Sequence, residues 1–202
     1  MDTSFATRVA DPAALAAIYN AFLLVGLPIA LLGQAVGQAA FPRLAAHADA
    51  EDWLGMRRTL FRSLLAAVGL SLPALAALIL LGRPTIRIIF ERGQFTAAAG
   101  DLTYLVLAVY AVGLPAYVAT EVVTRGLISM RDTRTPLLTN TFQLGLRIVL
   151  ISLLIGRLGT LAIPIAFAVS CSLETVALTS VLIVRLRRRI QLSSTRRQTL
   201  VV

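Results

Sequence analysis

The chain has little of what a soluble, catalytic or disulfide-linked protein requires. Only 14% of its 202 residues are charged, lysine does not occur, and there is one cysteine and one histidine. A single cysteine, Cys171, excludes a disulfide within the chain. A single histidine, His47, argues against a histidine-rich metal site, and no nucleophile–base pair or phosphate-binding glycine loop is visible. We therefore expect a protein that is not an enzyme and that uses no metal and no cofactor.

Long apolar runs are what the sequence has in abundance. Hydrophobic residues make up 57% of the chain, whereas soluble domains have about 45–50%. A membrane-spanning helix needs about 20 apolar residues. The sequence thus predicts an all-α integral membrane protein, with residues 1–202 forming a single transmembrane helical domain. The expected helices are 12–41, 59–81, 101–125, 135–155 and 160–184, and a basic tail follows at 185–202.

The basic residues indicate orientation rather than nucleic-acid binding. All 19 are arginines, set against 10 acidic residues, and they flank the apolar runs. Thirteen arginines lie in the loops and the tail on one side of the expected spans, and five lie on the other side. Because arginine-rich loops stay in the cytoplasm, we expect the C-terminus on the cytoplasmic side of the inner membrane and the N-terminus on the opposite side. Five spans that start outside predict the latter part of a longer multi-pass protein, or a chain that needs a partner.

One expected helix carries a charge near its middle. Arg147 lies about twelve residues into the run 135–155, where a charge facing lipid costs at least about 2.5 kcal/mol. Glu174 lies at comparable depth in the next helix, and Asn140 and Gln143 precede Arg147 by about two turns and one turn, respectively. Arg147 and Glu174 either lock two helices together or line a cavity in which the guanidinium binds phosphate.

Two further polar pairs lie within apolar runs, each four residues apart and thus on one helix face. Gln34 and Gln38 either line a polar cavity or hydrogen-bond to another helix. Glu121 and Arg125 have the order that favours a salt bridge. A salt bridge near the membrane boundary is the interpretation we prefer for this second pair, with a substrate or proton site as the alternative.

Prolines interrupt several of the expected spans. Pro28, Pro73, Pro115 and Pro164 each fall inside one, and a proline inside a helix removes one backbone hydrogen bond and kinks it. Ordinary kinks in a packed bundle and the flexing helices of a transporter both fit this pattern.

Four strings in fixed order point to a family: GLPIALLGQAVGQAAFPRLA (26–45), RPTIRIIFERGQFTAAAGD (83–101), YAVGLPAY (110–117) and RDTRTP (131–136). Together they resemble the MurJ/MviN family of lipid II flippases, which belongs to a superfamily of multidrug and polysaccharide exporters. The resemblance assigns structural roles to Pro28, Pro42, Arg92, Gly93, Pro115, Asp132, Thr135 and Pro136.

The resemblance implies a two-lobed, alternating-access flippase with fourteen spans, of which this chain matches the early second lobe. It further implies a bilayer environment, an undecaprenyl-diphosphate-linked cell-wall precursor as substrate, and a first-lobe segment or partner chain. One departure is that residues 20–27 lack the arginine that the family carries before the proline matching Pro28. Arg147 is our candidate to replace it. Export of another lipid-linked polysaccharide or a drug, and a non-transporting membrane subunit, remain the alternatives.

Overall fold

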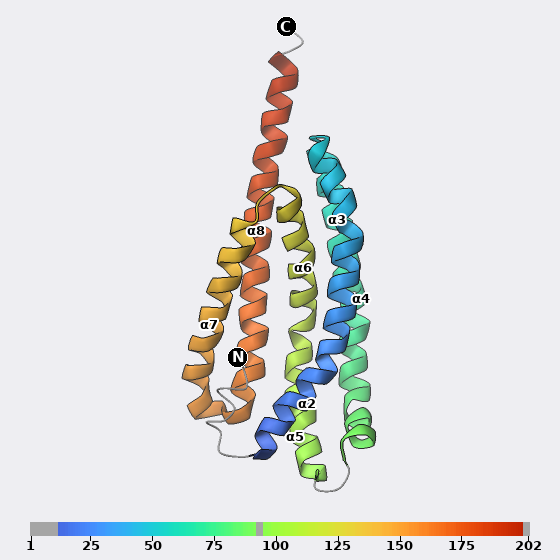
Figure 1. Cartoon of the computed structure of the whole chain (residues 1–202), viewed down its shortest axis with the longest axis vertical. Coiled ribbons are helices and arrows are strands. Elements are labelled where there is room, and N and C mark those ends of the chain that lie inside the picture. Colours follow the sequence, from blue (N-terminus) through green and yellow to red (C-terminus); the bar gives the residue numbers. More distant parts are fainter. Residues whose placement is uncertain (1–11, 92–94, 200–202) are drawn as a thin grey trace.

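The computed structural model describes residues 12–91 and 95–199, and in these ranges the chain is helical with no strand. Figure 1 shows the helices running along one long axis. In chain order they are α2 (Pro12–Pro28), the π-helical turn η1 (Ile29–Gly33), α3 (Gln34–Asp49), α4 (Trp53–Ile89), α5 (Ala97–Val112), α6 (Leu114–Ser129), α7 (Arg134–Leu158), the 3₁₀ turn η2 (Gly159–Leu161) and α8 (Ala162–Thr199). The predicted all-α architecture is confirmed.

Four helical stretches within the described residues are long and apolar enough to cross a membrane. The last of them, Arg134–Ser194, holds both α7 and α8. These two helices lie side by side and run in opposite directions (Figure 1). The chain reverses at Gly159, whose φ of 52° is a conformation that glycine adopts without the steric cost of a Cβ. The bundle therefore has five helical passes.

Two of the predicted proline breaks occur, in different forms. After Pro28 the helix widens into the π-helical turn η1, which accommodates a lost backbone hydrogen bond without ending the helix. Near Pro115 the pass divides at Gly113 into α5 and α6. Pro73 lies within an uninterrupted α4. The expected break at Pro164 is wrong, because this residue lies in the first turn of α8, where its missing N–H has no helical partner to lose.

The helices run beyond the ends of the apolar runs. α4 continues through residues 83–89, beyond the expected helix end at residue 81, and α8 continues to Thr199 through the expected tail. Arginine is a good helix former, so loss of apolar character does not end a helix. At 1.5 Å per residue, the 37 residues of α4 span about 55 Å, more than the ~30 Å hydrocarbon core. Both helices thus extend into the polar layers.

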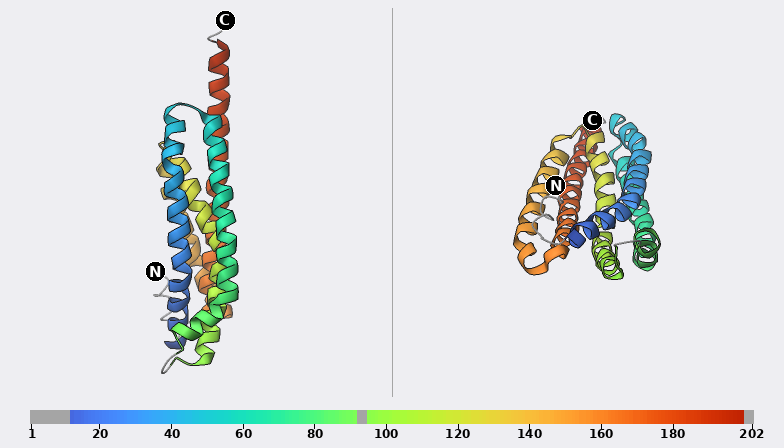
Figure 2. Two further views of the ribbon diagram at one scale, coloured as in Figure 1. Left: turned by 90° about the vertical axis from the view of Figure 1, so that its right-hand side faces the viewer. Right: turned by 60° about the horizontal axis from the view of Figure 1, so that its bottom comes forward.

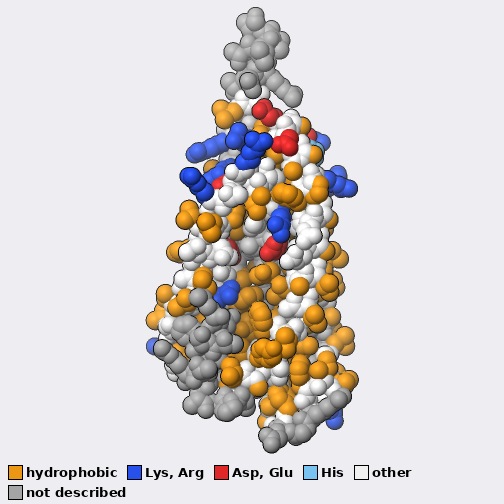
Figure 3. All heavy atoms as spheres, viewed as in Figure 1, with side chains coloured by type: hydrophobic (Ala, Val, Ile, Leu, Met, Phe, Trp, Pro, Cys, Tyr) orange, Lys and Arg blue, Asp and Glu red, His pale blue; other side chains and the backbone are white. Residues whose placement is uncertain are grey.

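Apolar side chains cover the outside of the bundle as well as its core. Leu31, Leu80 and Leu153 are 69%, 73% and 69% exposed, which suits a surface that contacts lipid. Figure 3 shows hydrophobic side chains over the middle of one face and arginines gathered near one end. This is the end at which α3 meets α4 and from which α8 projects (Figure 1).

Candidate functional site

A polar cluster lies between α7 and α8. Gln143 and Glu174 are only 6% and 8% exposed, although both lie in apolar helices. They face a cavity of about 590 Å³ between the two helices. Its lining consists of Leu138, Thr139, Phe142, Gln143, Leu146, Ser170, Leu173, Glu174 and Ala177. Buried polar groups in an apolar bundle are costly unless they are paired, so this cluster is the strongest candidate site.

Arg147 lies at the edge of this cluster and contacts α8. Its Nε donates to Ser170 Oγ at 3.4 Å, and an Nη atom lies 3.8 Å from Cys171 Sγ. Its guanidinium carbon lies 4.8 Å from the centre of the Phe167 ring, a cation–π contact. Its charge also interacts with that of Glu174. The Arg147 side chain thus contacts protein groups rather than lying along lipid.

Two amides on α7 complete the cluster. The Asn140 side chain interacts with the Glu174 carboxyl group. Gln143 Nε2 lies 3.4 Å from Cys171 Sγ. The structure therefore brings together four residues that the sequence singled out separately on α7 and α8, namely Asn140, Gln143, Arg147 and Glu174.

The cluster extends onto α6 through a residue that sequence reasoning missed. Tyr117 stacks on Phe167, with ring centres 6.2 Å apart. Its hydroxyl interacts electrostatically with Glu121, Arg147 and Glu174. The sequence spacing did indicate this residue, because Tyr117 lies four residues before Glu121 and so shares its helix face. Three helices thus contribute polar groups to one region.

Glu121 and Arg125 form the predicted salt bridge, with 3.7 Å between the charged atoms. Two glycines of the first pass, Gly33 at the end of η1 and Gly37 in α3, pack directly on this pair. A β-carbon placed on Gly33 would lie 3.3 Å from Glu121 Cγ, and one on Gly37 would lie 3.6 Å from Arg125 Cγ. The small residues thus allow α3 to approach α6 closely and to cover the ion pair.

Gln34 and Gln38 lie elsewhere. Both are exposed on α3, and Gln38 donates to Gln34 at 2.9 Å. The structure does not bring them to the cluster between α7 and α8. Their role in a cavity stays a prediction.

The RDTRTP string forms a clamp between a loop and α8. Asp132 Oδ1 accepts the backbone N–H of Thr135 at 3.1 Å, and Oδ2 lies 2.5 Å from an Arg185 Nη atom. Arg185 also donates to the Thr135 hydroxyl at 3.0 Å. Burial alone would raise the pKa of the Asp132 carboxyl, but the Thr135 hydrogen bonds and the Arg185 charge lower it below its usual value.

This clamp corrects one expectation. The expected helix starts at residue 135, whereas α7 begins at Arg134 and Asp132 supplies the side-chain acceptor for the N–H of Thr135. Of the other motif residues, Pro42 lies inside α3, and Pro136 lies in the first turn of α7. Arg92 and Gly93 lie outside the described residues.

Comparison with known proteins decides the family. The family model described as lipid II flippase MurJ matches residues 1–201. The chain belongs to the MurJ family. It is thus a multi-pass membrane protein, and the resemblance read from the four strings is confirmed.

Individual relatives agree with the family match. A protein of Rhizobium meliloti (strain 1021) named "Probable lipid II flippase MurJ" is 33% identical over 129 residues, which cover 64% of this chain and 24% of that protein. One of the same name from Rhizobium tropici is 32% identical over 165 residues, covering 82% and 31%. This chain therefore spans about a quarter to a third of the length of these MurJ relatives.

A solved structure shares the fold. It is titled "Lipid II flippase MurJ, inward closed conformation" and superposes with a TM-score of 0.77 at 22% identity. The match covers 88% of this chain and 38% of the solved chain. The five-pass arrangement is thus the fold of one part of a MurJ structure.

Proposed function

We propose that this chain is the second-lobe part of a flippase that moves a lipid-linked peptidoglycan precursor, lipid II, across the bacterial inner membrane. The observation that carries the proposal is the family match over nearly the whole chain, since it joins a known transport family to this helical bundle. The covered share of the relatives supports a chain that works with a first lobe, supplied by further sequence or by a partner.

In this proposal the cluster around Arg147 contacts the anionic part of the substrate. A guanidinium stays charged at every physiological pH and donates two parallel hydrogen bonds to phosphate. The contacts of Arg147 with Ser170 and Cys171, at 3.4 and 3.8 Å, are long and weaker than charge-assisted hydrogen bonds of about 2.7–2.9 Å. A diphosphate oxygen would make shorter, charge-assisted hydrogen bonds with this guanidinium, while the lipid tail stays in the bilayer.

The remaining polar groups would affect how strongly Arg147 binds the substrate. Asn140 and Arg147 both interact with the carboxyl group of Glu174. Substrate phosphate would weaken the attraction between Arg147 and Glu174, and release of the substrate would restore it. This exchange offers a route by which binding alters the contact between α7 and α8.

The orientation we propose follows from the arginines. Thirteen of the 19 lie at the bundle end from which α8 projects. The positive-inside tendency would then put this end and the C-terminus in the cytoplasm. The breaks at η1 and at Gly113 would supply bending points for alternating access.

A second candidate is export of a different lipid-linked polysaccharide or of a drug. The observation that favours it is the absence of a basic residue between positions 20 and 27. Leu23, in this stretch, is 47% exposed and presents an apolar side chain. A third candidate is a membrane subunit that binds a partner without transporting.

Complementation separates these candidates. The native flippase of a bacterium is depleted while this chain is expressed alone or fused behind the first lobe of a MurJ relative. We expect growth to be restored by the fusion and not by the chain alone. Insertion of both proteins is checked by protease protection. Failure of an inserted fusion would contradict the lipid II proposal and favour another substrate or a non-transporting role.

A further inference from the structure

Phe167 on α8 faces Arg147 across the contact between α7 and α8. The central carbon of the Arg147 guanidinium lies 4.8 Å from the centre of the Phe167 ring, and the Phe167 side chain is buried. Ser170 and Cys171 follow three and four positions later, so they share this face of α8. They lie 3.4 and 3.8 Å from nitrogens of the same guanidinium. One face of α8 thus holds the Arg147 side chain.

The contact with the ring differs in kind from a hydrogen bond. An aromatic ring attracts the face of the planar guanidinium, whereas the five N–H donors of that group lie in its plane. The contacts with Ser170 and Cys171 are longer than charge-assisted hydrogen bonds, which measure about 2.7–2.9 Å. The ring can therefore fix the direction of Arg147 without using an N–H group that phosphate would need.

Two tyrosines hold the Phe167 ring in place. The Tyr110 ring meets it edge-on, with ring centres 5.3 Å apart and planes inclined by 71°. The Tyr117 ring stacks on it, with centres 6.2 Å apart and planes inclined by 17°. Both arrangements are favourable for aromatic pairs. Because Tyr110 belongs to α5 and Tyr117 to α6, both parts of this helical pass fix the ring.

Gly113 brings the Phe167 ring to the point at which this pass is broken. α5 ends at Val112 and α6 begins at Leu114. A β-carbon on Gly113 would lie 3.3 Å from two carbons of the ring, so the missing side chain permits this close approach. Figure 2 shows α8 between α7 on one side and the pass formed by α5 and α6 on the other. A bend at Gly113 would therefore move the ring and, through it, Arg147.

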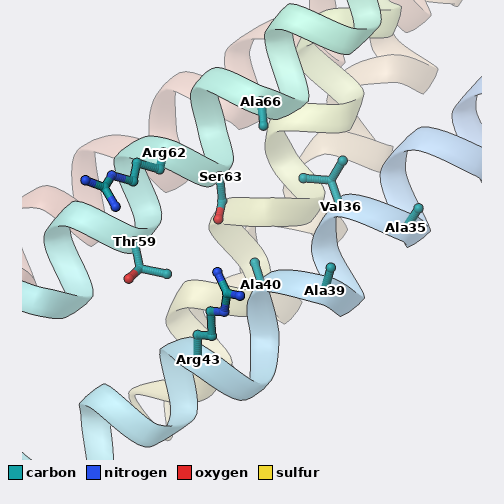
Figure 4. A pocket seen from close by; sticks show the side chains of 9 residues that line it. All are labelled: Ala35, Val36, Ala39, Ala40, Arg43, Thr59, Arg62, Ser63 and Ala66. Carbon is teal, nitrogen blue, oxygen red and sulfur yellow. The ribbon is translucent and has the colours of Figure 1, made fainter.

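Other arginines of the chain provide a comparison. Figure 4 shows Arg43 and Arg62 in a pocket of about 500 Å³ between α3 and α4, and none of the described residues that line it is aromatic. Arg189 does lie over a ring, 5.3 Å from the centre of Trp53, but it belongs to the arginine-rich end of α8. Arg147 differs from all three, because it is the single charged residue between positions 135 and 156.

We propose that Phe167 is a positioning residue, which sets the direction of the Arg147 guanidinium and couples it to the helix break at Gly113. Phe167 acts through Arg147 and contacts no substrate itself. A bend between α5 and α6 then turns the guanidinium together with the ring and changes its access to phosphate. This consequence for transport rests on the proposed function, whereas the contact between ring and guanidinium is a property of the chain itself.

The contact is tested by the NMR signals of the guanidinium N–H groups in the purified full chain, prepared with isotope-labelled arginine in detergent. Loss of a signal in Arg147→Lys assigns it. Protons above the face of a ring are shielded, so we expect the Arg147 signal upfield of those of the two arginines in Figure 4. Phe167→Leu keeps an apolar side chain without a ring and should abolish the shift. The matched control Phe22→Leu removes a ring that meets only Tyr110 in this row, at 5.8 Å, and should keep it.

A ring of nearly equal size separates attraction from packing. Trifluorophenylalanine at position 167 fills almost the same space, but its fluorines withdraw negative charge from the ring face on which the attraction depends. The Arg147 signal should then move toward its position in Phe167→Leu. Gly113→Ala should also displace the signal, because its β-carbon presses on the ring. Gly69→Ala meets nothing within 4 Å and should leave the signal unchanged.

Growth of flippase-depleted cells that express the first-lobe fusion tests the consequence for transport. The fusion with Phe167→Leu should restore growth less well than wild type, and Phe22→Leu should restore it fully. Full growth with Phe167→Leu, a shift that survives the loss of the ring, or a signal that ignores Gly113→Ala would each overturn the proposal. Failure of the proposed function looks different. The Arg147 signal would then respond to the ring as expected, while the fusion with Arg147→Ala would grow normally.

Discussion

The Arg185 guanidinium lies 2.5 Å from a carboxylate oxygen of Asp132 and ties the loop between α6 and α7 to α8. The two residues are 53 positions apart in the sequence. Asp132 is 8% exposed, and its other oxygen accepts the N–H of Thr135 at the start of α7. One carboxylate therefore fixes the start of one helix against the side of another.

Asp132→Asn should destabilise the chain by about 1–3 kcal/mol, because it weakens a cap and leaves Arg185 without its charged partner. The midpoint of thermal unfolding in detergent measures this loss. Asp49→Asn is the matched control, since the pair of Asp49 with Arg131 is 72% and 90% exposed and such pairs contribute little. Equal losses in the two variants would contradict the clamp.

The contribution of Asp132 should depend on pH. The folded-state pKa of this carboxyl is lowered from its usual value of 3.8, so the folded chain binds the proton less readily than the unfolded chain. The stabilisation is then fully present well above pH 3.8 and is lost as the pH falls through the lower folded value. The difference in unfolding midpoint between wild type and Asp132→Asn should therefore be constant from pH 7 to 5 and shrink toward pH 3. A difference that grows on acidification would contradict the assignment.

Gly113→Ala should destabilise the chain by about 1–3 kcal/mol. A β-carbon there would lie 3.1 Å from Cα of Ala168 and 3.3 Å from the Phe167 ring, and the backbone of α8 yields less easily than a side chain. Gly69→Ala is the control, because it meets nothing within 4 Å and improves helix propensity. The midpoints of thermal unfolding of the two variants should shift in different directions or by clearly different amounts. Equal shifts would mean that α5 and α6 do not approach α8 as closely as described.

Cys171 should react slowly with maleimide reagents in the folded chain. It is 1% exposed and lies against Gln143 and Arg147. Gln143→Ala should speed the labelling by opening the cluster, whereas Gln38→Ala on the surface of α3 should not change it. As the only cysteine, it reports on this site without background. Fast labelling of the wild type would show that the cluster is open to water.

The sequence was most informative about the cluster on α7. Asn140, Gln143 and Arg147 were recognised because spacings of three and four place residues on one helix face, and Glu174 because of its depth in the next apolar run. Tyr117 was missed, although its spacing from Glu121 carried the same signal, because a tyrosine in an apolar run does not stand out as polar.

Other features depend on tertiary structure. The pairing of Asp132 with Arg185 could not be predicted, since no local spacing relates a loop to a residue of α8. The ends of α4 and α8 were misplaced because hydropathy marks the bilayer rather than the helix, and arginine-rich segments continue a helix into water. The effect of Pro164 was also predicted wrongly. It depends on how far the proline lies from the start of the helix, and hydropathy does not locate that start.

The most direct test of the central claim is growth of flippase-depleted cells that express the first-lobe fusion with and without Arg147→Ala. We predict that the wild-type fusion restores growth fully and that the Arg147→Lys fusion restores it partly. The Arg147→Ala fusion should not restore growth although it inserts normally. Arg157→Ala, at the exposed end of the same helix, should behave like wild type. Full growth with Arg147→Ala would contradict the proposed role of this arginine in binding substrate phosphate.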